Sequence, residues 1–451
     1  MPEWASEGYA KFTKTNSLYV LVTLDRGPVI LLPPGQMKTV YRLPEDRLDV
    51  FGTLQEQIQA KYTVRDQRII RDPFHRHLIP SQLTRELDLF TASIVAEIDG
   101  VFQSSWGDET GWKDVPVWQT CFQAIARATN STLYGRALCR EKKYIQLLEG
   151  QSAALFGGSI LISITPEVLR PLVAYLKIAN ICSPYIEQRI NKTIEDRTGT
   201  ESSHRPTKDG LQLIIDEAIS RGDSTELSAR LIADRLLITN NVTLNGVAFT
   251  VHHILLNIVS SEPSLGYIEA LREEFEECED AVGEAGGIWS LEAVRKLKLM
   301  DSTIRESMRI SPFSSVVMAR TVVDPQGIPL ESGGSSILIP RGVVLALPVE
   351  SIHYDEKIYP DAQRFNPYRF VSHKPRNGES KGQRYATSKP TTTADDHFFG
   401  FGTSKNPCPG RFLAALNYDI KYTKANYQPS NFIGMKVPKM NVHLRVKRRS
   451  S

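Results

Sequence analysis

Cys408 is the residue of this chain best suited by its type and surroundings to bind a metal or act as a nucleophile. It lies in residues 401–410 (FGTSKNPCPG), a turn rich in Gly and Pro, and a short apolar run suited to a helix follows directly. Backbone N–H groups and the positive end of a helix dipole both lower the pKa of a thiol, so we expect a thiolate here. The alternative is a buried cysteine in an ordinary turn.

A second chemically distinctive set of residues is charged. Glu306 and Arg309 stand three residues apart in a helical pattern, so they share one helical face. Taken alone, such a pair is most often a surface salt bridge that contributes little to stability. Arg369 follows sixty residues after Arg309 in residues 365–370 (FNPYRF), and the Cys408 turn comes next.

In this order, the motifs E-x-x-R, F-x-P-x-R-F and F-x6-C-x-G resemble the signature of the cytochrome P450 superfamily. The resemblance covers essentially the whole chain and is closest to fungal members that modify terpenoid, alkaloid or polyketide metabolites. It implies a mainly α fold with a small β region in one large domain. It also implies a haem b cofactor whose axial iron ligand is the Cys408 thiolate, which pushes electron density toward O–O cleavage.

The resemblance assigns further roles near Cys408. Phe401 would shield the thiolate, and Gly402, Asn406 and Gly410 would complete the cofactor-binding loop. Asn406 stands where the family usually has a basic residue or a histidine that pairs with a haem propionate, and an uncharged amide makes a weaker bond to a carboxylate.

The resemblance also implies that Glu306, Arg309 and Arg369 form a buried charge triad. The triad would lock the segment that leads to the ligand loop. Burial of three charges is tolerated only as a fully hydrogen-bonded set, so we expect the loss of any one to be severe.

Asn245 and Gly246 stand where the family has an acidic or polar residue followed by Thr, the pair that supplies protons for oxygen activation. They lie in a candidate helix from about residue 225 to 261. Asn245 cannot titrate and Gly246 has no hydroxyl, but Thr243 and Thr250 keep hydroxyls on the same helical face. Gly246 is either a packing site or kink, at about 1 kcal/mol relative to Ala, or a gap that leaves room for a bulky ligand.

Two other features have a functional and a plain interpretation. His252 and His253 are adjacent on this helix and diverge by about 100°, so they are expected to be packed or solvated rather than to share a metal. The loop before Cys408 is basic, and the family uses this face to receive NADPH-cytochrome P450 reductase; a solvated loop is the alternative. Its basic residues are Lys374, Arg376, Lys381, Arg384 and Lys389, against Glu379.

Composition narrows the class of protein. The 451 residues are 41% hydrophobic and 23% charged, with a net charge of +3, which is typical of globular proteins and gives no reason to expect nucleic acid. Five widely spaced cysteines without a C-x-x-C pair argue against zinc, an iron–sulfur cluster and a disulfide framework. No run of about 18 consecutive apolar residues is present, so we expect no N-terminal membrane anchor and a location on the cytoplasmic side, peripheral to the endoplasmic reticulum.

Hydrophobic periodicity divides the expected domain, residues 1–451, into three parts. Residues 1–50 alternate in the β sense, with a hairpin between two apolar strands, and residues 51–310 are a helical body. Residues 311–451 contain β segments, a meander and the ligand loop. After Ala414 the family continues as a helix, whereas residues 417–422 alternate like a strand, so part of the wall beneath the haem is expected to be missing.

The resemblance to the cytochrome P450 superfamily predicts a haem-thiolate monooxygenase that inserts one oxygen atom from O2 into a hydrophobic small molecule. A haem-binding protein that has lost oxygen activation is the alternative, motivated by Gly246, Asn406 and the shortened helix. A third possibility is an enzyme with redox-neutral or peroxide-driven chemistry, which does not need the proton-supplying Thr.

Overall fold

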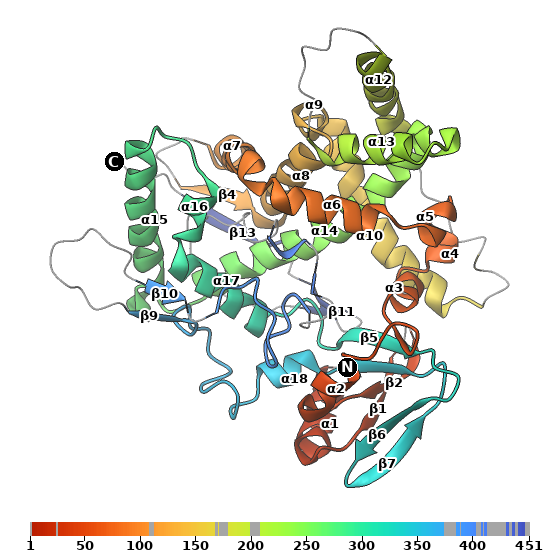
Figure 1. Ribbon diagram of the computed structural model, residues 1–451. Coiled ribbons are helices and arrows are strands. Elements are labelled where there is room, and N and C mark those ends of the chain that lie inside the picture. The colour runs from red at the N-terminus through yellow and green to blue at the C-terminus, as the bar shows by residue number, and fades with distance from the viewer. Residues whose placement is uncertain are drawn as a thin grey trace.

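The chain folds into a mainly helical body with several small sheets, as the sequence predicts (Figure 1). The computed structural model describes residues 2–23, 26–107, 112–166, 170, 179–198, 208–373, 385–387, 389–402, 407–408, 410–412, 430–432, 435–437 and 441–446. The helices are α1 (Pro2–Lys11), α2 (Pro34–Val40), α3 (Phe51–Gln57), α4 (Ala60–Thr63), α5 (Arg68–Arg71), α6 (His75–Arg85), α7 (Leu87–Trp106), α8 (Val117–Leu133), α9 (Arg136–Cys139), α10 (Lys142–Ile164), α12 (Ala179–Thr198), α13 (Gly210–Ser220), α14 (Ala229–Val259), α15 (Tyr267–Glu284), α16 (Leu291–Arg295), α17 (Lys298–Ile310) and α18 (Val349–His353). The strands are β1 (Tyr19–Thr23), β2 (Gly27–Leu31), β3 (Leu48–Asp49), β4 (Lys113–Pro116), β5 (Val317–Val322), β6 (Ile328–Ser332), β7 (Ser335–Ile339), β8 (Val344–Leu347), β9 (Val371–His373), β10 (Tyr385–Thr387), β11 (Ser430–Phe432), β12 (Met435–Val437) and β13 (His443–Val446).

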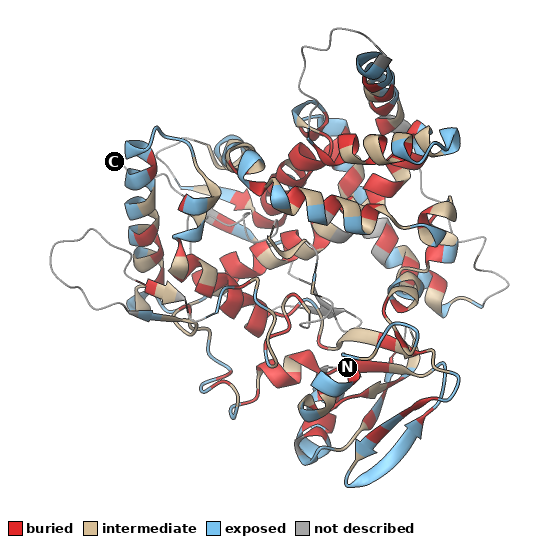
Figure 2. Cartoon of the chain, viewed as in Figure 1, coloured by how far each residue is buried: buried red, intermediate tan, exposed pale blue. Residues whose placement is uncertain are grey.

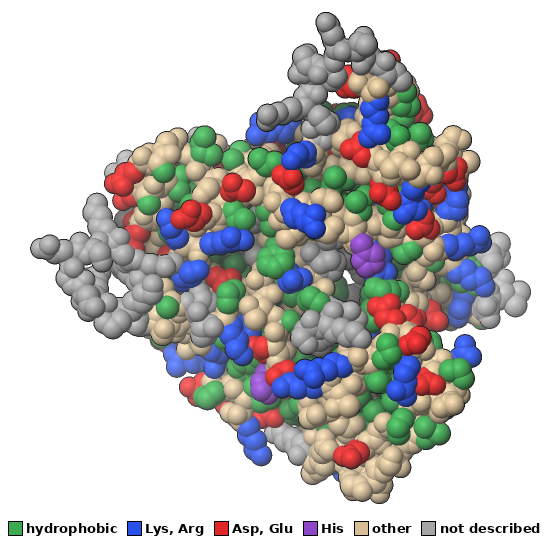
Figure 3. Space-filling view, viewed as in Figure 1, with side chains coloured by type: hydrophobic (Ala, Val, Ile, Leu, Met, Phe, Trp, Pro, Cys, Tyr) green, Lys and Arg blue, Asp and Glu red, His purple; other side chains and the backbone are tan. Residues whose placement is uncertain are grey.

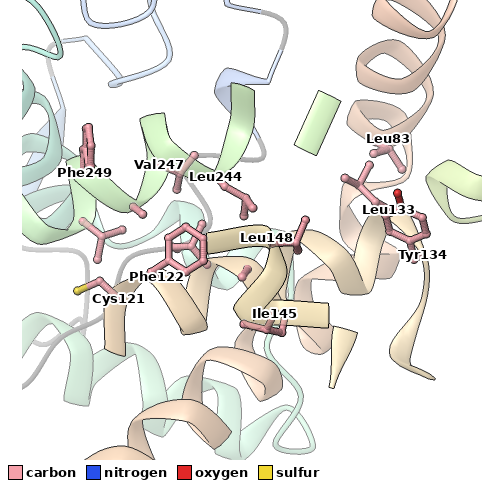
Figure 4. Close-up of a cluster of buried hydrophobic side chains, with 14 of the residues drawn as sticks. Leu83, Cys121, Phe122, Leu133, Tyr134, Ile145, Leu148, Leu244, Val247 and Phe249 are labelled. Atoms are coloured by element: carbon pink, nitrogen blue, oxygen red, sulfur yellow. The ribbon is translucent and has the colours of Figure 1, made fainter. Parts of the chain in front are cut away.

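The largest apolar core surrounds α14, which runs through the middle of the molecule and packs against α8, α10, α12 and α17 (Figure 1). Figure 4 shows Phe122 of α8, Leu148 of α10 and Leu244 of α14 gathered in this core. α14 and α17 are mostly buried, whereas α15 exposes one side to solvent (Figure 2). These two buried helices carry the candidate residues at positions 245–250 and 306–309.

α14 is shorter than the predicted helix from about residue 225 to 261. Residues Ser224–Leu227 form a 3-10 turn, and Ser228 is extended, so the α-helix begins at Ala229. α14 is long and apolar enough, by length and composition alone, to cross a membrane, but 71% of that stretch is buried inside the protein. Burial of this extent is what a central core helix requires.

A five-stranded sheet has the strand order β1-β2-β8-β5-β3. β1 and β2 form the predicted antiparallel hairpin, with Tyr19 opposite Leu31, and β2 pairs in parallel with β8. The first fifty residues also contain α1 and α2, so this part is mixed rather than purely β. Strands β9 and β10, which form a separate two-stranded sheet, pack against the charged helix α17.

The N-terminus of α17 is fixed by a carboxylate from α15. Glu274 accepts hydrogen bonds from the backbone N–H groups of Leu299 (2.7 Å) and Met300 (2.9 Å). These N–H groups have no partner within the helix, so a buried acceptor at this point stabilises it. Nearly every residue of α17 is buried, so its charged side chains require internal partners.

On the face shown in Figure 3, acidic and basic side chains are interspersed. Of the basic loop residues, Lys389 is described; it lies exposed and pairs with Asp395 at 3.3 Å. The prediction for Lys374, Arg376, Lys381 and Arg384 lies outside the described residues, as do those for Asn406 and for residues 417–422.

Candidate functional site

Cys408 lies in a tight loop that backbone hydrogen bonds close. The N–H of Cys408 donates to the carbonyl of Phe401 (2.7 Å), and the N–H of Gly402 donates to the carbonyl of Phe399 (3.1 Å). Gly402 also forms an antiparallel bridge with Pro407. Gly402 has φ +87°, in the left-handed region where a side chain is disfavoured. The loop therefore depends on Gly402 and on the position of the segment just before it.

Cys408 is an exposed residue, but the pKa of its thiol is raised rather than lowered. Burial of the sulfur among protein atoms is the largest effect; the N–H groups of Gly410 and Arg411 and the guanidinium of Arg411 oppose it. The predicted low pKa is thus wrong for the protein by itself. A coordinated metal ion deprotonates a thiol outright, so metal binding does not require a lowered pKa beforehand.

Phe401 is buried in the main apolar core, close in sequence to a glycine that has no room for a side chain. A Cβ added to Gly400 would lie 2.6 Å from the ring of Phe398 and 2.9 Å from Cε of Met308 on α17. Gly410 is different, because a Cβ there would lie 4.0 Å from the sulfur of Cys408, an ordinary contact. Close packing therefore occurs at Gly400, in the segment just before the Cys408 loop.

The structure brings Glu306, Arg309 and Arg369 together. Glu306 accepts from Nε of Arg309 (2.7 Å), Nη2 of Arg309 (2.8 Å) and Nε of Arg369 (3.0 Å). The side chains of Glu306 and Arg309 are fully buried, and that of Arg369 is 11% exposed. Both guanidiniums also donate to backbone carbonyls, including those of His353 and Pro360. The three residues therefore form an internal, hydrogen-bonded set, and Glu306 and Arg309 are not a surface salt bridge.

A second buried ion pair on α17 was not predicted from the sequence. Arg305 is fully buried and donates to Asp395 (2.5 Å) and to the carbonyl of Pro390 (3.0 Å). Its guanidinium also lies 3.9 Å from the ring centroid of Phe398. Asp395 is ninety residues away and lacks a local motif, so the sequence offers no signal for this pair.

The two predicted threonine hydroxyls of α14 are hydrogen-bonded within the helix. The hydroxyl of Thr250 donates to the carbonyl of Gly246 (2.8 Å), and that of Thr243 donates to the carbonyl of Thr239 (2.9 Å). A Cβ built on Gly246 meets nothing within 4 Å. This glycine is therefore not required by tight packing, and the helix is open at this point.

Asn245 and the two histidines are buried. Nδ2 of Asn245 and both ring nitrogens of His252 lack a hydrogen-bond partner in the described part of the chain. Burial lowers the pKa of His252 to about 3, so its ring is neutral. The ring packs beside Trp118, at 6.0 Å between centroids. His252 and His253 are thus core residues, in line with the plain interpretation.

Comparison with known proteins identifies the family to which this helical fold and its cysteine loop belong. The cytochrome P450 family matches residues 50–423, and the chain belongs to it. It is 33% identical to the cytochrome P450 monooxygenase okaG of Penicillium ochrochloron over 100% of this chain and 89% of that protein. It is 28% identical to gloP of Glarea lozoyensis over 98% of the chain and 86% of that protein, and 32% identical to htyF of Aspergillus rugulosus over 92% and 62%.

The chain is therefore a cytochrome P450 monooxygenase, an oxidoreductase similar to fungal enzymes of secondary metabolism. The family implies a haem-thiolate cofactor, a redox partner and hydrophobic substrates. These statements hold for the class and leave the individual substrate and reductase open to proposal.

Two arginines fit the carboxylates that haem b carries. Arg320 is 6% exposed and Arg76 is half-buried, and neither forms an ion pair with a carboxylate of the described chain. Arg320 lies 5.2 Å from the ring of Tyr41, and Arg76 lies 3.2 Å from that of Phe51. Burial lowers the pKa of both, and the charge of Glu45 opposes this at both, so they share one region. Burial of these cations without a direct ion pair is costly, and the two haem propionates would compensate it.

Proposed function

We propose that the protein is a haem b monooxygenase that inserts one oxygen atom from O2 into a hydrophobic fungal metabolite of terpenoid, alkaloid or polyketide type. NADPH-cytochrome P450 reductase would supply the two electrons, and the second oxygen atom would leave as water. The observation that carries the proposal is the closed Cys408 loop, which begins at a segment anchored to the buried charges of α17.

In this proposal each residue has a definite task. Cys408 ligates the iron, and the haem, when bound, supplies the site at which dioxygen is activated. Phe401 packs in the apolar core and would shield the sulfur from water. Arg76 and Arg320 pair with the two propionates. Gly402, Gly410 and Asn406 complete the loop that holds the cofactor.

The open side of α14 would deliver protons to the site of oxygen activation. The hydroxyl of Thr250 is engaged as a donor to the carbonyl of Gly246, so its oxygen can accept a hydrogen bond from water. Asn245 offers a free N–H donor but no titratable proton. Gly246 leaves space for a water molecule or for part of the substrate. Protons would therefore arrive through water held by these residues rather than from a side-chain acid.

The lack of a side chain at Gly246 supports a second candidate function. Without a hydroxyl at Gly246, the protein would bind haem but activate oxygen poorly, or would perform redox-neutral or peroxide-driven chemistry. Turnover separates these functions, since only the monooxygenase forms a hydroxylated product when NADPH, reductase and dioxygen are all supplied.

The test of the cofactor site is spectroscopic. The reduced protein under carbon monoxide should show the strongly red-shifted Soret band of thiolate-ligated haem, and Cys408→Ala should abolish it. The matched controls are alanine variants of the other four cysteines, which should retain the band. Persistence of the band in Cys408→Ala would refute the assignment. The control positions are Cys121, Cys139, Cys182 and Cys278.

A further inference from the structure

His353 lies at the end of α18 and is fully buried against the segment that precedes the cysteine loop. Its ring stacks on Phe398, with 5.8 Å between centroids and an angle of 12° between planes. It also stacks on Phe399, at 6.0 Å and 8°. The ring is thus held in one plane by two consecutive aromatic side chains. No motif in the sequence drew attention to this residue.

Both ring nitrogens of His353 have backbone partners, and these partners fix its tautomer. The N–H of Phe399 points at Nε2 at 3.2 Å, so Nε2 is the acceptor. The proton is therefore on Nδ1, which lies 3.0 Å from the carbonyl of Arg309 and donates to it. Burial and the neighbouring charge of Arg309 lower the pKa of the ring to about 3, so the neutral form persists throughout the ordinary pH range.

His353 joins the charge triad to the loop through a continuous set of hydrogen bonds. Nη1 of Arg309 donates to the carbonyl of His353 (2.6 Å), so these two residues are linked twice. On the other side, the carbonyl of Phe399 accepts from Gly402. The carbonyl of Phe401 then accepts from the N–H of Cys408 (2.7 Å). Three residues thus separate the imidazole from the sulfur-bearing residue.

We propose that His353 is a positioning residue for Cys408: its neutral imidazole holds the Phe399 N–H and couples the Arg309 backbone to the ligand loop. The proposal rests on the proposed function, because it assumes that Cys408 ligates haem iron. The ring touches neither substrate nor cofactor in this role. It sets where the loop begins and therefore where the sulfur lies.

Loss of the ring nitrogens would leave the buried N–H of Phe399 without an acceptor, because Phe399 is 4% exposed. The segment would relieve this by moving, and Gly402 and Cys408 would move with it. We expect the ratio of thiolate-ligated to other carbon monoxide complexes to fall about tenfold, equal to about 1.4 kcal/mol. Weaker thiolate donation should also raise the reduction potential of the haem.

The experiment compares three substitutions in the full-length, haem-loaded protein. His353→Phe keeps the stacking and removes both nitrogens. His353→Gln places an amide near the position of Nε2 and can still accept from Phe399, whereas His353→Asn reaches only the position of Nδ1. The control is Tyr144→Phe, which removes two other buried hydrogen bonds away from the loop, one donated to Asn130 (2.9 Å) and one accepted from Asn240 (3.4 Å).

The expected order of the thiolate-band ratio is unsubstituted protein, then Gln, then Asn, then Phe, with Tyr144→Phe equal to the unsubstituted protein. Equal ratios and potentials for Gln, Asn and the unsubstituted protein would overturn the proposal, even if stability falls. If His353→Phe does not load haem, the Gln and Asn variants decide. Absence of the band in the unsubstituted protein would instead refute the proposed function, and the inference with it.

Discussion

Replacement of Glu306 by alanine should be among the most damaging single changes in this protein. The substitution removes a fully buried carboxylate that accepts two hydrogen bonds from Arg309, one from Arg369 and one from the N–H of Asn366 (3.0 Å). Two guanidiniums are then left inside the protein without a counter-charge. Breaking a buried ion pair in this way costs about 3–5 kcal/mol, and the whole stability of a domain is about 5–15 kcal/mol.

A matched control is available in Glu97, which is also fully buried and also paired with two arginines. Its partners Arg127 and Arg140 have side chains that are 23% and 56% exposed. Water can solvate these cations once the carboxylate is gone, so we expect Glu97→Ala to cost less than half as much as Glu306→Ala. The assay is the thermal midpoint together with the haem content of the purified protein, because unfolding of a cofactor protein is not two-state.

The double variant of Glu306 and Arg309 sharpens this test. Arg309→Ala alone leaves a buried carboxylate with only one cationic partner, Arg369, so it should be as severe as Glu306→Ala, and the double change should be much milder than the sum. Arg369→Ala should be the mildest, since its side chain is 11% exposed. A Glu306→Ala protein that is soluble, haem-loaded and no less stable than Glu97→Ala would refute this reasoning.

Three further outcomes follow from the described contacts. Gly246→Thr adds atoms where a Cβ meets nothing within 4 Å, so the variant should fold normally. It should raise the ratio of product formed to NADPH consumed and lower the hydrogen peroxide released. The control is Gly157→Thr, at an equally open position, which should change neither quantity. Gly400→Ala should reduce the thiolate band, because its Cβ would lie 2.6 Å from Phe398, whereas Gly283→Ala, which meets nothing, should not. Burial lowers the pKa of His252 from 6.5 to about 3, so the unfolded chain takes up a proton that the folded chain does not as the pH falls below 6.5. His252→Leu should therefore stabilise the protein by about 2 kcal/mol more at pH 5 than at pH 8, seen in thermal midpoints; an equal gain at both values would show that the ring is protonated in the fold.

The main elements could be predicted because their patterns are local. The hairpin of β1 and β2 was visible as two alternating runs around a turn, and α14 as a long apolar period that ends before Pro263. Glu306 and Arg309 are visible because they share a helical turn. Arg369 was found through the family motif, since nothing local shows that it reaches back to α17.

What the sequence could not show depends on packing. The thiol pKa of Cys408 was predicted from its N–H groups alone, but the surrounding protein atoms act in the opposite direction and are stronger. Arg305, Asp395 and His353 have ordinary local contexts, but His353 bonds to Arg309 across 44 residues and Arg305 pairs with Asp395 across 90. Such contacts exist only after the chain has folded.

The two sides of the proposed haem site are built in opposite ways. On the cysteine side, the segment before the loop is fixed to α17 by Thr391 on Asp301, by Asp395 on Arg305, and through His353 by Phe399. On the α14 side, a glycine faces open space and the nearby hydroxyls are bonded to their own helix. In the proposed function, the anchored segment before the loop would set where the sulfur lies, and the open helix would leave the supply of protons to water and substrate. Changes at α17 should therefore alter iron ligation, and changes at Gly246 should alter coupling, because no described residue belongs to both sets of contacts.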